Sequence, residues 1–356
     1  MSSPAPRSPA PPAEDRAAAL CHALRVRLPG PPADAEDVFR TAATAWWPDS
    51  PPRLWLDPVP AVAGSPMGER RLRSERLRPI EQDGPVLRAV CLVYSDGPAD
   101  LVLVARRSVL DATSLRHIAD VVAGTIAAAE IQPPTLPPMC SADGETLATD
   151  GVAETGWATS EAGAGDRTGQ VSVVLGGEHP DAIPALAVAA GIVLGRYTEK
   201  ATSQVLLSGA PADRPANTLG SFDGLSALTL DLSGETNLGE LVSQVAQAAH
   251  GDPVTAKTEP ALAIFASGND VQGYDVQEYL ACQAPVCPLT LVPRGTGDRL
   301  TVAVHHRLRE IDRASATRFA AHLAHVHAQL LANDPARDPR DLDLVGAAPA
   351  RGGRGG

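Results

Sequence analysis

The chain has 356 residues, which is enough for two domains of ordinary size. Hydrophobic residues make up 44% of the chain and aromatic residues only 3%, so its cores must be built mainly from Ala, Val and Leu. The formal net charge of -12 argues against a general nucleic-acid binder and against a protein that binds anionic membranes. It does not exclude an acidic protein partner that meets a local basic patch.

The sequence contains five cysteines: Cys21, Cys91, Cys140, Cys282 and Cys287. They have no zinc-like spacing, and their odd number disfavours a complete disulfide framework. We therefore expect small buried thiols in a reduced, cytoplasmic protein that holds no metal. No apolar run is long enough to span a membrane, and residues 1–13 lack the apolar centre of a signal peptide.

Composition divides the chain into five parts. Residues 131–168 lose periodicity and are rich in Pro, Gly, Ser, Thr and acidic residues, as is typical of a linker. We therefore expect a first lobe at residues 16–130 and a second at residues 169–346. Residues 1–15 and 347–356 are interpreted as disordered tails.

Periodic apolar residues predict alternating strands and helices in both lobes. In the first lobe we expect strands that end at residues 28, 56, 94 and 105, and helices at 33–47 and from residue 111 or 113 to 123. In the second lobe we expect strands at 170–175, 203–208, 226–232, 260–265 and 299–306, and helices at 182–198, at 237–249 and up to 331.

A polar motif follows the buried strand at 101–105: Arg106-Arg107-Ser-Val-Leu-Asp111-Ala112-Thr-Ser114. This frame resembles the HHxxxDGxS signature of the condensation domains of nonribosomal peptide synthetases. Asp111 and Ser114 match the signature, whereas Arg106 and Arg107 replace its two histidines and Ala112 replaces its glycine. Three other runs resemble family motifs in the same order: Gly84-Pro-Val-Leu-Arg-Ala89, Gly209-Ala-Pro-Ala-Asp-Arg-Pro215 and Ile311-Asp-Arg-Ala-Ser315. The resemblance covers most of the chain between residues 24 and 344.

The resemblance implies an α/β fold of two chloramphenicol-acetyltransferase-like lobes, each a mixed sheet flanked by helices. The lobes would form a V-shaped pseudo-dimer around a tunnel. It also implies that Asp111 forms a structural salt bridge with Arg214, which would hold the motif loop. Because the fold would depend on this pair, we expect Asp111 to be architectural.

Arg107 occupies the place of the family's second motif histidine, which positions or deprotonates the attacking amine. A guanidinium group effectively never gives up its proton, so the amide-forming mechanism of the family is disfavoured. Arg107 could still stabilise an oxyanion or bind a carboxylate or a phosphate. We assign no catalytic residue; the candidates are the motif positions Arg106, Arg107, Asp111 and Ser114.

Two other groups of residues invite a functional interpretation. The basic segment 67–78 is either a docking patch for an acidic carrier protein or a phosphate, or a solvated amphipathic segment. His305 and His306 adjoin in an expected strand, so they point to opposite faces and cannot serve one site. We interpret the three histidines of the last helix, His322, His325 and His327, as surface residues rather than as a metal site.

The resemblance implies a stand-alone protein of a nonribosomal peptide or hybrid polyketide pathway, without a cofactor of its own. We expect a non-catalytic platform for a peptidyl or acyl carrier protein, which would bring its phosphopantetheine arm, or for a tailoring enzyme. The alternative is an atypical acyltransferase or condensation enzyme that uses the tunnel with Arg107 as its anion-binding group. An inactive remnant is the third hypothesis.

Overall fold

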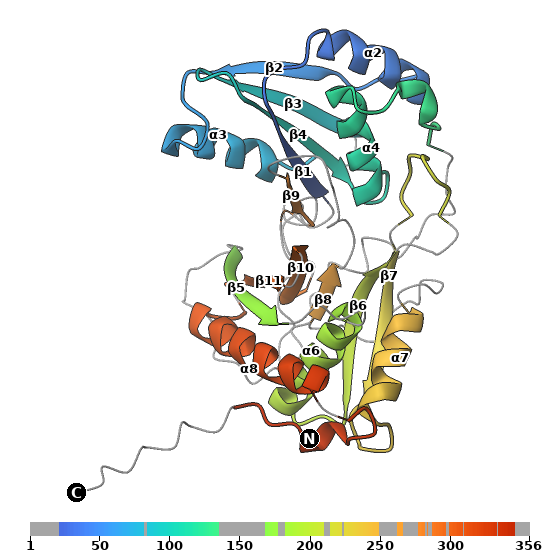
Figure 1. The fold of residues 1–356 in the computed structure, drawn as a ribbon, viewed down its shortest axis with the longest axis vertical. Coiled ribbons are helices and arrows are strands. Elements are labelled where there is room, and N and C mark those ends of the chain that lie inside the picture. Colours follow the sequence, from blue (N-terminus) through green and yellow to red (C-terminus); the bar gives the residue numbers. More distant parts are fainter. Residues whose placement is uncertain are drawn as a thin grey trace, which may run out of the picture.

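Two β-sheets, each covered by helices, organise the chain (Figure 1). The computed structural model describes residues 21–81, 84–134, 168–176, 182–209, 214–222, 224–248, 262–265, 277–281, 283, 287–296, 299–308, 310–332 and 334–345. Both expected tails and residues 135–167 of the expected linker lie outside these ranges. No helix within the described ranges is long and apolar enough to cross a membrane.

The first sheet has the strand order β2-β3-β4-β1-β9. Its strands are β1 (Cys21–Leu28), β2 (Leu54–Val59), β3 (Leu87–Tyr94), β4 (Ala99–Arg106) and β9 (Gln277–Leu280). Its helices are α2 (Ala35–Trp46), α3 (Pro66–Leu77) and α4 (Ala112–Ala123), followed by the short 3-10 helix η1 (Ala128–Glu130). Helices α2 and α4 pack on one face of the sheet and α3 on the other, because successive side chains of each strand alternate between two separate apolar clusters.

The second sheet has the order β5-β11-β10-β8-β6-β7 and is mixed, because β8 runs parallel to both of its neighbours. Its strands are β5 (Thr168–Gly176), β6 (Thr202–Gly209), β7 (Gly224–Asp231), β8 (Leu262–Phe265), β10 (Leu289–Thr296) and β11 (Arg299–Arg307). Its helices are α6 (Ala182–Thr198), α7 (Leu238–Ala248) and α8 (Arg313–Ala332), and the 3-10 helix η2 (Pro339–Asp341) follows them. All three α-helices pack against one face of this sheet.

Helix α6 is buried along most of its length, which explains its Ala-rich sequence. It lies against β7 so closely that a Cβ atom at Gly191 would come within 2.4 Å of the Leu230 side chain. A Cβ at Gly195 would come equally close to Leu232, at 2.4 Å. The small residues of α6 are therefore required by packing and not by conformational freedom.

The two lobes share an apolar core. Residues on the face of the second sheet that its helices leave uncovered join the cluster formed by the first sheet with α2 and α4. They are Leu206, Ala263, Phe265, Val292 and Ala303. The apolar core of the first lobe therefore extends into the second lobe. Burial of apolar side chains, and not a polar contact alone, joins the two lobes.

Strand β9 comes from the second half of the chain but belongs to the first sheet, and it was not predicted from the sequence. It lies beyond the linker, within the range expected to form the second lobe, yet it pairs antiparallel with β1 at the edge of the first sheet. Strand β10 was not predicted either. It contains Pro293, which argues against a central strand, but its ladder with β8 covers only Leu289–Leu291 and so ends before the proline.

The first residues of the expected linker are ordered. Ile131 is buried, and Gln132 forms a parallel bridge with Thr218 of the second lobe. The backbone of Gln132 donates to Asn217 and accepts from Leu219. Composition could not reveal this short contact across the lobes.

A buried charge network fixes β9 in the first sheet. Asp100 on β4 has a fully buried side chain and accepts two hydrogen bonds from Arg25, two from Arg27 and one from Tyr94. Burial alone would raise the pKa of Asp100, but the hydrogen bonds from the two arginines outweigh it, so the pKa is lowered. Arg25 also reaches Glu278 on β9 at 3.1 Å, which extends the network to the added strand.

Candidate functional site

The motif loop connects the end of β4 to the start of α4, at the boundary between the two lobes (Figure 1). Asp111 is the N-cap residue of α4, and its carboxylate accepts a hydrogen bond from the backbone N–H of Ser114 at 2.7 Å. An aspartate at this position satisfies a free N–H group of the first helical turn. Asp111 therefore sets the position at which α4 begins, directly after the motif loop.

Asp111 also binds the second lobe. Arg214 donates to both carboxylate oxygens, from Nε at 3.2 Å and from Nη2 at 3.1 Å. The backbone N–H of Phe222 donates to the same carboxylate at 3.3 Å, and the side chain of Asp111 is fully buried. The structure thus brings together the two residues that the resemblance paired, and it places the pair across the boundary between the lobes.

Ser114 is used in the same contact. Its hydroxyl donates to the carbonyl oxygen of Gly220 at 2.9 Å and accepts from the N–H of Gly220 at 3.0 Å. The N–H of Asp111 donates to that same carbonyl at 2.8 Å. Because the Ser114 hydroxyl is buried and occupied in both directions, it holds the loop and does not present a nucleophile.

Arg107 also contacts the second lobe, through an aromatic ring. Its guanidinium carbon lies 3.9 Å from the ring centre of Phe265, at the end of β8 in the second lobe. This is a cation–π contact between residues of different sheets. Two of its donor atoms, Nε and Nη2, are buried and have no hydrogen-bond partner among the described residues. Arg106 is the last residue of β4, where it pairs with Cys21 of β1, and its Nε is likewise buried without a hydrogen-bond partner among the described residues.

A histidine that the motif does not contain lies near Arg107. His22 on β1 is fully buried, and its Nδ1 lies 2.8 Å from the hydroxyl oxygen of Tyr279 on β9. Burial lowers the pKa of His22 well below its ordinary value, and the charge of Arg107 lowers it further, while the Leu110 carbonyl acts in the opposite direction. His22 is therefore the neutral imidazole of this region.

Three residues of this region, His22, Tyr279 and Phe265, were not predicted from the sequence. His22 is in phase with Leu24, Val26 and Leu28, so the alternation that predicted the strand also indicated that this histidine is buried. Phe265 and Tyr279 lie more than 150 residues further along the chain, and no local pattern connects them with Arg107. Only the pairing of β9 with β1 and the packing of β8 against the motif loop bring them together.

Most histidines of β11 and α8 have structural contacts. The Nδ1–H group of His306 donates to the carbonyl oxygen of Ile311 at 2.9 Å. The ring of His306 also covers Gly169, where a Cβ would come within 2.3 Å of it. His305 lines a groove on the other face of β11. His322 contacts the hydroxyl of Tyr197 at 2.6 Å, and His327 is buried, which corrects the expectation that it lies on the surface.

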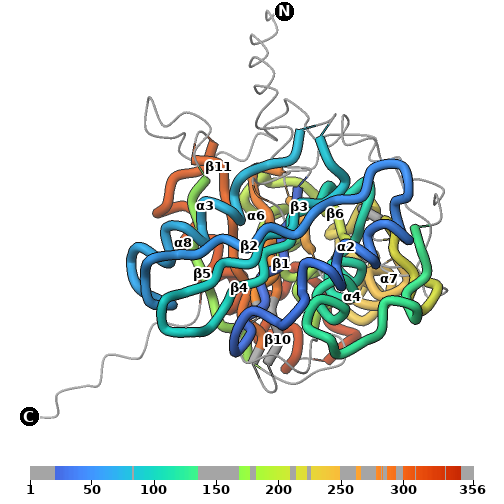
Figure 2. The backbone as a smooth tube through the Cα atoms, turned by 90° about the horizontal axis from the view of Figure 1, so that it is seen from above, coloured from blue at the N-terminus to red at the C-terminus, as the bar shows by residue number. Residues whose placement is uncertain are grey.

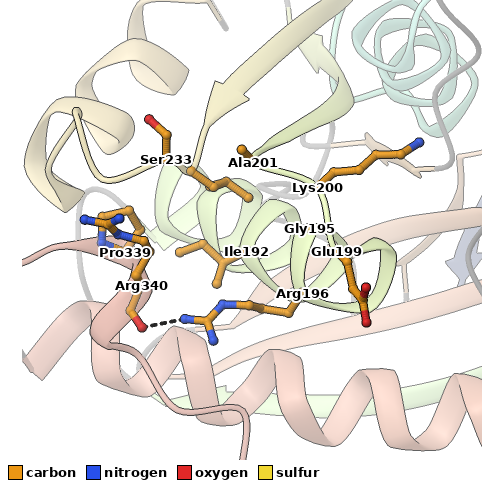
Figure 3. A pocket seen from close by; sticks show the side chains of 10 residues that line it. Ile192, Gly195, Arg196, Glu199, Lys200, Ala201, Ser233, Pro339 and Arg340 are labelled. Atoms are coloured by element: carbon orange, nitrogen blue, oxygen red, sulfur yellow. Dashed lines mark hydrogen bonds between the residues drawn. The ribbon is translucent and has the colours of Figure 1, made fainter.

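Two cavities lie away from the motif. One of about 450 Å³ lies at the end of α6, where Arg196 donates to the backbone carbonyl of Arg340 at 2.6 Å (Figure 3). Arg196 is thereby used to fix the C-terminal segment. A larger groove of about 1070 Å³ lies between α3 and the strands β5 and β11. Neither cavity is lined by Arg107, Asp111 or Ser114.

Comparison with known proteins identifies the fold. No family model matches the sequence, and no curated protein matches it. The X-domain from teicoplanin biosynthesis is 17% identical, with a TM-score of 0.62 over 97% of this chain and 99% of that domain. The starter condensation domain of the rhizomide synthetase RzmA is 13% identical, with a TM-score of 0.64 over 92% and 94% of the two chains. The teicoplanin X-domain in complex with OxyB also matches, at 16% identity and a TM-score of 0.59 over 92% and 91%.

These similarities define the class of the fold. The chain has the two-lobed, chloramphenicol-acetyltransferase-like fold of condensation domains and X-domains. The predicted fold class is therefore confirmed. Identities of this size establish the fold alone.

Replacing Asp111 tests whether the motif loop joins the lobes. Asp111→Ala leaves Arg214 and the N–H groups of Ser114 and Phe222 without their buried acceptor, so we expect a loss of about 3–5 kcal/mol in the free energy of unfolding. Thermal and chemical denaturation measure it. The matched control, Asp341→Ala, removes an exposed aspartate and should change little. An unchanged melting temperature in Asp111→Ala would contradict the assigned role.

The burial of His22 predicts a pH dependence of stability. Its pKa is lowered in the folded protein, so below about pH 6.5 only the unfolded chain takes up the proton, and stability falls as the pH falls. His22→Gln should lose less stability than the wild type between pH 7 and pH 5 in urea denaturation. Tyr279→Phe keeps the imidazole and should behave as the wild type does. Equal losses in His22→Gln and the wild type would refute the prediction.

Proposed function

We propose that this protein is a non-catalytic interaction platform of nonribosomal peptide or hybrid polyketide biosynthesis. It would bind a carrier protein or a tailoring enzyme of its pathway in the cytosol. One observation carries the proposal: the motif positions that perform or support chemistry in condensation domains are here occupied by contacts between the lobes. Asp111 and Ser114 bind the segment that contains Arg214 and Gly220, and Arg107 packs on Phe265.

The chemistry of Arg107 supports this reading. Peptide-bond formation by this fold requires a group that can accept or position a proton of the attacking amine, and a guanidinium only donates. His22 provides an imidazole nearby, but it is fully buried and bound to Tyr279. A base without access to the substrate does not replace the missing motif histidine.

A structural neighbour supports the choice of partner. The X-domain from teicoplanin biosynthesis, which shares this fold, forms a complex with OxyB, a second protein of that pathway. A fold of this class can therefore serve protein recognition. We extend that role to the present chain as a proposal and name its partners by class only.

A second candidate function follows from the two unpartnered donors of Arg107. Buried guanidinium N–H groups without acceptors are rare in proteins, and a bound oxygen atom would satisfy them. A thioester carbonyl or a carboxylate in the space between the lobes is such an acceptor. The protein would then be an atypical acyltransferase that uses Arg107 to stabilise negative charge.

One experiment separates the two functions. The protein is incubated with carrier proteins loaded with acyl or aminoacyl groups, while binding is followed by calorimetry and transfer by mass spectrometry. The platform predicts binding without transfer, and the affinity of Arg107→Ala should stay within about twofold of the wild type. Transfer that Arg107→Ala abolishes would overturn the platform and establish the acyltransferase.

A further inference from the structure

Helix α3 forms one wall of the groove of about 1070 Å³ between the lobes. Figures 1 and 2 both place α3 on the same side of the molecule as β5 and β11, which form the opposite wall. The helix turns Arg70, Arg73 and Leu77 towards the groove, and their spacing of three and four residues puts them on one helical face. The basic segment of the sequence is therefore a helix with a defined functional face.

The two arginines on this face are free to bind a ligand. Arg70 and Arg73 are exposed, and neither forms an ion pair with a carboxylate of the described residues. Their neighbours behave differently, because Arg71 binds Asp57 at 2.7 Å and Arg76 binds Glu278 at 2.5 Å. Arg71 and Arg76 of this helix therefore form structural ion pairs, whereas Arg70 and Arg73 form none with the described residues.

The rest of the groove adds little negative charge. Glu69 is its only acidic lining residue among those described. The wall from the second lobe contributes Thr168, Gln170 and His305, none of them acidic, and Gln283 also lines the groove. Gln283 donates to the backbone carbonyls of Arg76 and Arg78, at 2.7 and 3.1 Å, and so ends α3 in a fixed position. Leu77, which is 38% exposed, adds an apolar contact at that end.

This local charge runs against the composition of the whole chain. A protein with a net charge of -12 repels acidic partners over most of its surface, so a groove with unpaired arginines selects where such a partner approaches. Two guanidinium groups one helical turn apart match a pair of carboxylates on a peptide. A nucleic acid fits less well, because its many phosphates would meet the acidic surface around the groove.

We infer that the groove between α3 and the strands β5 and β11 is the docking site for an acidic segment of a partner protein, with Arg70 and Arg73 as its carboxylate-binding residues. The inference rests on the proposed platform function and assigns partner binding to this groove. The site is distinct from the motif loop, so docking does not require the space around Arg107.

A double charge reversal tests the site on the full chain. Arg70→Glu/Arg73→Glu is compared with the control Arg53→Glu/Arg313→Glu, which reverses two exposed arginines outside the groove and changes the net charge equally. Binding is measured by fluorescence anisotropy with a labelled ten-residue peptide of alternating Glu and Leu, and by calorimetry with carrier proteins and tailoring enzymes of the pathway. Duplex DNA is the competitor.

The inference predicts that the groove variant binds both the peptide and the natural partner about tenfold or more weakly than the wild type, while the control stays within about twofold. Equal weakening in the two variants would overturn the inference, since general charge would then explain binding. A partner that binds the groove variant as tightly as the wild type overturns the inference and leaves the platform function intact.

Two further outcomes are also decisive. If no pathway protein binds any of the three forms, the platform function fails, and selective loss of the peptide in the groove variant still supports an acidic-peptide site. If DNA displaces the peptide at a lower concentration than unlabelled peptide does, the site is for nucleic acid and the inference is wrong.

Discussion

The carboxylate of Asp111 is the constraint on which the arrangement of this protein depends. It caps α4 in the first lobe and accepts hydrogen bonds from Arg214 and from the backbone of Phe222 in the second. A buried carboxylate is tolerated only where such partners replace water, so the loop and the segment 214–222 must stay together. Ser114 reinforces the same contact through Gly220. The motif loop therefore acts as a joint between the lobes, and the shared apolar core packs around it.

On the proposed platform function, this joint is the part of the motif that the chain retains. In the condensation-domain frame the aspartate supports the loop while the histidine serves the reaction, so the two can be lost independently. In this chain Asp111 holds the loop through Arg214, and Arg107 packs on Phe265 of the opposite lobe. The imidazole of His22, whose pKa the charge of Arg107 lowers, is buried against Tyr279. On the proposed function, partner recognition takes place at the surface, in the groove beside α3.

Much of the fold could be predicted from the sequence, and the exceptions have physical causes. Alternating Leu24, Val26 and Leu28 gave β1, and the Ala-rich run gave α6 with the bounds that the structure has. The frame Asp111 to Ser114, with Arg214, led to the candidate site because short motifs carry their spacing in the sequence. Strand β9 was missed because four residues that pair with a strand 250 residues away have no local signature. Phe265 and Tyr279 were missed for the same reason, and the groove was missed because its walls come from both lobes.

The measurement that tests the central claim most directly is a double-mutant cycle between Asp111 and Arg214. The free energy of unfolding is determined for the wild type, Asp111→Ala, Arg214→Ala and the double variant. If the pair joins the lobes, the double variant is less destabilised than the sum of the single variants, by about 1–3 kcal/mol. Strictly additive losses would contradict the account, since the ion pair would then carry no coupling between the lobes.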